Sequence, residues 1–110
     1  MKTDRELLEL AAKAAGKDVI WKCGMHRGEP HEGLFDRSTG HATTWNPLTD
    51  DGDALRLAVK LDMVVQRGSA HVLIHEWAPL FHANEHGNDK LAVTRRAIVR
   101  AAAAIGEGME

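Results

Sequence analysis

The chain has 110 residues, enough for one hydrophobic core and too few for two, so we expect a single domain over residues 1–110. Hydrophobic residues make up 44% of the chain and charged residues 27%, as is ordinary for a globular protein. The formal net charge of −2 argues against duplex nucleic acid as the main partner, because phosphate binding depends on clustered Lys and Arg. No apolar run is long enough to span a bilayer, and no signal peptide is expected. The single cysteine, Cys23, excludes an internal disulfide and fits a reducing cytosol, so we expect a cytoplasmic protein.

The first predicted element is a helix that begins near Thr3 or Asp4, either of which can cap it. Glu6 has the spacing of a capping box, and Gly16 stands where a left-handed C-terminal cap belongs. The apolar residues between them recur at helical spacing: Leu7, Leu8, Leu10, Ala11, Ala14 and Ala15.

A short apolar run at residues 19–23 predicts a strand. Residues 24–33, rich in Gly and His, are expected to form an irregular loop. Residues 34–35 and 41–45 flank a connection that ends in Gly40 and predict a hairpin.

A second helix is predicted after Pro47, capped by Thr49 or Asp50, with acidic residues in its first turn. Residues 63–66 and 70–77 then predict two strands around a tight turn, followed by an irregular loop at 79–88. The residues of this second helix that are expected to be buried are Leu55, Leu57, Ala58, Val59 and Leu61.

The last predicted element is a helix over residues 89–105. Its arginines, Arg95, Arg96 and Arg100, are expected to face mostly outward. Its core-facing residues are expected to be Leu91, Ala97, Ile98, Ala101, Ala102 and Ile105. Across the whole chain we expect one core that contains Leu55, Val59, Val72, Ile74, Ile98 and Ile105.

The element order is helix, hairpin, helix, hairpin, helix, which predicts an α+β fold. A small antiparallel sheet covered by helices would bury three apolar stripes, giving a three-layer α-β-α sandwich. The successive apolar residues 72–74 favour a strand that is covered on both faces.

Three segments of the chain carry a family resemblance: residues 4–16, 45–61 and 94–106. The middle segment, which runs from Trp45 through Asn-Pro and Thr-Asp-Asp-Gly-Asp-Ala, is the most specific. It closely resembles a segment of the phage ABA sandwich domain family, which consists of small phage and prophage proteins. The resemblance implies a three-layer α-β-α sandwich and a phage or prophage origin within a host bacterial cell, and it implies no catalytic residues.

The chain has seven histidines, and two spacings are of the kind seen in zinc sites: Cys23 with His26, and His82 with His86. Neither builds a complete tetrahedral set, so we expect no metal and no cofactor. The aspartates at 50, 51 and 53 are explained better by helix capping than by a bound divalent cation.

The aromatic and arginine residues provide the best candidate ligand site. Trp45 precedes a helix N-terminus, where its ring could stack on a base, although core packing is the usual role of tryptophan. Arg95, Arg96 and Arg100 form a candidate set for phosphate contacts, from which Arg95 and Arg96 are chosen, although a solvated helix face explains the set equally well.

The sequence is therefore compatible with three classes of function. The first is a non-enzymatic phage accessory protein that binds a ligand, such as one that sequesters a nucleotide-type host defence signal. The second is a protein–protein interaction module, either a homo-oligomer or a binder of a host protein, that acts through an exposed apolar edge. The third, a phosphoesterase-type enzyme, is disfavoured because the sequence contains neither a paired acid–base motif nor a complete metal motif.

Overall fold

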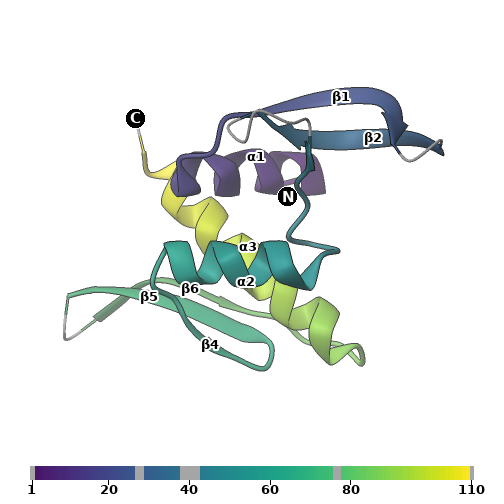
Figure 1. The fold of residues 1–110 in the computed structure, drawn as a ribbon. Helices are drawn as coiled ribbons and strands as arrows, with labels where there is room; N and C mark the ends of the chain where they lie inside the picture. Colours follow the sequence, from purple (N-terminus) through teal and green to yellow (C-terminus); the bar gives the residue numbers. More distant parts are fainter. Residues whose placement is uncertain (1, 27–28, 38–42, 76–77, 110) are drawn as a thin grey trace.

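The computed structural model describes residues 2–26, 29–37, 43–75 and 78–109, and it leaves out the side chains of residues 22–26, 29–32, 36, 43, 72–75 and 78–84. Within these ranges the chain forms three helices and two three-stranded antiparallel sheets (Figure 1). In chain order the elements are α1 (Asp4–Ala15), β1 (Val19–His26), β2 (Glu29–Asp36), β3 (Thr43–Thr44), α2 (Asp51–Lys60), β4 (Val64–Gln66), β5 (Ser69–His75), β6 (Ala78–Asn84) and α3 (Lys90–Glu107).

The helix boundaries follow the capping chemistry. The side chain of Thr3 accepts from the backbone N–H of Glu6, and Gly16 ends α1 in the left-handed region at φ +69°, which confirms both predicted caps. Asp50 caps α2 by accepting from the N–H of Asp53, and Asp89 caps α3. The three helices were therefore predicted correctly to within a few residues.

The two predicted hairpins are each part of a three-stranded sheet, with strand orders β1-β2-β3 and β4-β5-β6. The expectation of one small sheet was wrong, whereas the α+β class is confirmed. Residues 41–42 and 76–77, which belong to two of the predicted strands, lie outside the described residues.

Two predicted loops are largely strand. Residues 24–26 continue β1 and pair with the first residues of β2, and β6 occupies residues 78–84. Each of these two predicted loops contains a proline. Pro30 lies beyond the stretch of β2 that β3 pairs with, and Pro79 lies in the edge strand β6 beside register irregularities, which are positions where a sheet tolerates proline.

The helices occupy the middle of the molecule. Figure 1 shows the β1–β2 hairpin on one side of them and the β4–β6 sheet on the other. Helix α3 packs against α1, α2 and the β4–β6 sheet. On the opposite side, the guanidinium carbon of Arg5 in α1 lies 4.6 Å from the centre of the Trp21 ring in β1. The α-β-α layer order implied by the family resemblance stays a prediction.

Small residues let α1 and α3 approach closely, because their facing surfaces are mainly alanine. The buried core joins these helices to Leu34 of β2, Trp45, Leu57 of α2 and Ala70 of β5 in one cluster. The buried alanines of α1 and α3 are Ala11, Ala12, Ala15, Ala97, Ala101, Ala102 and Ala103.

The core prediction was right for Ile98, which is buried, and wrong for Leu55, Val59 and Leu91, which are 65%, 67% and 62% exposed. Helix α2 has apolar residues around more than half of its circumference, so periodicity does not decide which face is buried. The structure buries the face with Ala54, Leu57 and Ala58. Ile105 is half-buried, and the side chains of Val72 and Ile74 lie outside the described part of the chain.

Candidate functional site

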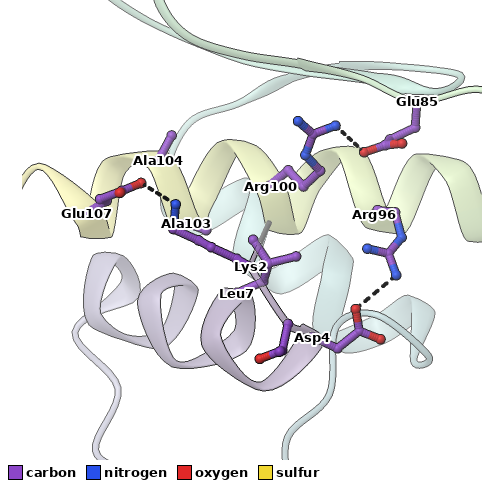
Figure 2. Close-up of a pocket in the computed structure, with 10 residues that line it drawn as sticks. Lys2, Asp4, Leu7, Glu85, Arg96, Arg100, Ala103, Ala104 and Glu107 are labelled. Atoms are coloured by element: carbon purple, nitrogen blue, oxygen red, sulfur yellow. Dashed lines mark hydrogen bonds and ion pairs between the residues drawn. The ribbon is translucent and has the colours of Figure 1, made fainter.

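A hollow of about 750 Å³ lies between the start of α1 and one face of α3. Its apolar surface comes from Leu7, Ala103 and Ala104, and Figure 2 shows charged side chains from three parts of the chain around it. These charged residues are Lys2, Asp4, Glu85, Arg96, Arg100 and Glu107.

Local structure explains why these residues meet. Thr3 caps α1, so Lys2 and Asp4 are held at the helix start. Arg96 and Arg100 are four residues apart on α3 and therefore share one face of the helix. Glu85 directly follows β6, where its N–H donates to the carbonyl of Gly68 over 2.7 Å.

Every cation of the hollow has a carboxylate partner. Lys2 Nζ lies 3.0 Å from Glu107 Oε2, Arg96 Nη2 lies 3.0 Å from Asp4 Oδ1, and Arg100 Nη1 pairs with Glu85 Oε1. The three positive and three negative charges balance, so the attraction of the hollow for a free anion is limited. The Glu85 side chain is the least exposed of the six at 18%, whereas that of Asp4 is 63% exposed.

The side chains that line the hollow can contact charged and polar groups. Among the described residues that line it there is no Cys, His or Ser. The one hydroxyl, that of Thr3, accepts from the Glu6 N–H and donates to the Glu6 carboxylate. The guanidinium groups and the ammonium group can offer charge-assisted hydrogen bonds to an anionic group.

Arg95, a predicted phosphate contact, is directed elsewhere. Its Nε donates to the carbonyl of Leu48 over 2.8 Å, and its Nη1 lies 2.6 Å from Asp51 Oδ1. Successive helical residues project about 100° apart, so Arg95 cannot share the face of Arg96. The Arg95 side chain is only 16% exposed, and it links α3 to the loop before α2 and to the first residue of α2.

Trp45, the predicted stacking residue, is 3% exposed and belongs to the core. It lines the edge of a second hollow of about 390 Å³ with Thr44, Asn46 and Arg56, and Lys17 Nζ lies 6.0 Å from its ring centre. The three predicted ligand-binding residues therefore lie in different places. Trp45 lines one hollow, Arg96 lines another, and Arg95 links α3 to α2.

The aspartates of the segment that carries the family resemblance have structural partners. Asp50 caps α2, Asp51 pairs with Arg95, and Asp53 Oδ2 accepts from the N–H of Asn46 over 3.0 Å. The Asn46 side chain in turn accepts from the N–H of Leu48. Capping and loop bonding thus explain much of this sequence pattern, as was predicted for the aspartates.

The histidine and cysteine candidates give no metal centre within the described part of the chain, where no group of three or more His, Cys, Asp or Glu side chains could hold an ion. His86 is exposed in the loop before α3. The side chains of Cys23, His26 and His82 lie outside the described residues, so the absence of a metal stays a prediction.

The hollow contains residues that were not predicted from the sequence. Lys2, Asp4 and Glu85 are separated from Arg96 by up to 94 positions and carry no motif. The one available signal was the four-residue spacing of Arg96 and Arg100, which places two guanidinium groups on one helix face. That spacing favours the pair Arg96 and Arg100 over the predicted pair Arg95 and Arg96.

Comparison with protein-family models, curated proteins and solved structures gives no match for this chain. Among the described residues, no helix has the length and hydropathy needed to cross a membrane.

Proposed function

We propose that this chain is a non-enzymatic binding protein that holds a small anionic ligand of the nucleotide type in the hollow between α1 and α3. The observation that supports the proposal is that Lys2, Arg96 and Arg100, from both ends of the sequence, surround one hollow. The resemblance of the segment at 45–61 adds the rest of the proposal: a phage or prophage accessory protein that sequesters a host defence signal in the bacterial cytoplasm.

The proposed ligand lies in the hollow that Arg96 lines, whereas Trp45 lines a different one. A buried ring exposes little of its face for stacking, so the phosphate contacts carry more of the recognition than the base. Arg96 keeps its predicted role, with Arg100 beside it in place of Arg95.

The test is calorimetric titration of the full chain with a panel of cyclic nucleotides and ADP-ribose-type compounds. Binding without turnover is expected, and Arg96→Gln should weaken it at least about tenfold because a charge-assisted contact is lost. Arg37→Gln is the matched control, since Arg37 also forms an exposed ion pair, with Asp18, and does not line the hollow. Turnover of a compound would support the enzyme instead, and no binding by any member of the panel would contradict the proposal.

A second candidate is the protein–protein interaction module, favoured by the exposed apolar residues of α2. Leu55 and Val59 are one turn apart, so they form a single ridge, and both are about two-thirds exposed. Exposed apolar surface of this kind marks interaction sites when it is contiguous.

Light scattering after size-exclusion chromatography tests this candidate. If the ridge joins copies of the chain, the double change Leu55→Ser with Val59→Ser should shift an oligomer towards monomer. Met109→Ser, which alters another exposed apolar residue far from α2 in sequence, should not. A wild-type chain that is monomeric at all concentrations would remove the homo-oligomer and leave only a host protein as partner.

A further inference from the structure

We infer that the group recognised in the hollow is a phosphate, bound by Arg96 and Arg100, and that Asp4 is a built-in competitor that occupies Arg96 when the hollow is empty. The inference rests on the proposed function and adds to it the chemical class of the recognised group and the residue that sets its affinity.

The guanidinium groups of Arg96 and Arg100 line the same hollow. Arg96 and Arg100 lie one turn apart on α3, and Figure 2 shows each meeting a carboxylate beside the hollow. Each guanidinium makes one such contact in the described part of the chain, and neither contact is the two-bond fork that Arg forms at its best. A guanidinium has five N–H donors, so both side chains keep donors for a planar or tetrahedral oxyanion.

The partners of the two arginines differ in how readily they can leave. The Asp4 side chain is 63% exposed and can turn into solvent, where water replaces its bond to Arg96. An exposed ion pair contributes little stability, so this exchange costs little. The Glu85 side chain is only 18% exposed, and the N–H of the same residue donates to the carbonyl of Gly68. Glu85 therefore stays in place and positions Arg100, whereas Asp4 is the carboxylate that an incoming phosphate displaces.

The pair formed by Lys2 and Glu107 resembles the pair at Asp4, with side chains that are 37% and 58% exposed. When Asp4 and Glu107 turn outward, the charges that face the ligand are Lys2, Arg96 and the fixed pair of Arg100 with Glu85. The balance of the hollow then changes from neutral to a net positive charge. A phosphate with two negative charges gains more from this change than a monovalent anion, which is how the hollow would select phosphate over chloride.

The experiment uses inorganic phosphate as the probe and the full chain, with chloride at matched ionic strength as the reference anion. The side-chain Nε–H signals of Arg96 and Arg100 in nuclear magnetic resonance spectra report on the site directly. Phosphate is expected to shift both signals in a saturable manner, whereas chloride should not. Arg96→Gln should weaken phosphate binding about tenfold or more.

The decisive variant is Asp4→Asn, which removes the competitor while it keeps the size of the side chain. It should tighten phosphate binding about two- to fivefold, the effect of removing one exposed ion pair. Glu9→Gln is the matched control, because Glu9 also lies on α1, forms an exposed ion pair with Arg5, and is not among the residues that line the hollow. Both variants change the net charge equally, so a long-range charge effect would appear in both.

The outcomes separate this inference from the proposed function. If Asp4→Asn and Glu9→Gln bind phosphate equally, or if phosphate leaves both arginine signals unshifted, the inference is wrong even when a nucleotide binds and Arg96→Gln weakens it. If phosphate binds with the expected variant effects while no nucleotide binds better than phosphate alone, the phosphate site holds and the nucleotide proposal fails.

Discussion

At the scale of single residues, Gly106 controls how closely the two long helices pack. It lies in α3 and is buried against the backbone of α1, where a Cβ atom built on it would overlap the carbonyl oxygen of Leu10. The clash is with the main chain, so no side-chain rotation can relieve it. Glycine is needed here for space, since its backbone conformation is that of an ordinary helix.

We therefore expect Gly106→Ala to destabilise the protein by about 3 kcal/mol, at the upper end of overpacking costs. In an exposed helix the same change stabilises by up to about 1 kcal/mol, so the sign of the effect reports on the packing. Gly108→Ala is the control, because a Cβ there would meet its nearest atoms at the ordinary distances of 3.6 and 3.8 Å. Urea denaturation followed by circular dichroism measures both changes, and equal stabilities would contradict the predicted close approach.

At the scale of elements, α2 shows how capping fixes a helix start. The carboxylate of Asp50 accepts from the N–H of Asp53 over 2.7 Å, and the carboxylate of Asp53 holds the N–H of Asn46 in the preceding loop. The loop and the helix therefore form one hydrogen-bonded unit, which positions Trp45 at the core and Asp51 beside Arg95.

Asp50→Ala should lower the free energy of unfolding by about 1 kcal/mol, the usual contribution of an N-cap. The matched control is Asp18→Ala. The Asp18 side chain is 60% exposed and that of Asp50 is 59% exposed, but Asp18 forms a surface ion pair with Arg37 instead of a cap. The control should change the stability by less than about 0.5 kcal/mol. Thermal unfolding of the two variants tests the prediction, and a larger loss for Asp18→Ala would contradict it.

Helices were the elements that the sequence predicted best, because caps such as Thr3, Asp50 and Gly16 act through bonds a few residues away. The division of the strands into two sheets depends on long-range pairing, which local pattern does not encode. The places of Pro30 and Pro79 within strands depend on the same long-range pairing, since a proline breaks a strand only where another strand needs its N–H.

The candidate site was predictable only in part. Arg96, a predicted phosphate contact, lines the hollow, and the residues around it come from both ends of the chain. Trp45 and Arg95 were predicted because their side chains suit ligand binding. In the structure Trp45 packs in the core, and Arg95 donates a hydrogen bond from α3 to the loop before α2. Burial of a tryptophan and the direction of an arginine are decided by tertiary packing, which the residue types alone do not reveal.

At the scale of the whole molecule, α3 holds the structure together. It packs against α1 and α2, and also against the β4–β6 sheet. Its buried residues Ile98 and Val99 belong to the same core cluster as Leu34 and Trp45 near the other sheet. Loss of α3 packing should therefore expose both sheets at once, and the two halves of the molecule should unfold together.

We therefore expect Ile98→Ala to destabilise the whole molecule by about 2–5 kcal/mol and to lower the melting temperature by on the order of 10 °C, in one transition. Leu91→Ala, a truncation on the same helix, should have an effect below about 0.5 kcal/mol, because the Leu91 side chain is 62% exposed whereas Ile98 is 5% exposed. Far-UV circular dichroism follows the helices and tryptophan fluorescence follows the surroundings of the three tryptophans, Trp21, Trp45 and Trp77, so the two signals should change at the same temperature in every variant. Separate transitions, or an unchanged melting temperature for Ile98→Ala, would mean that α3 does not couple the two sheets.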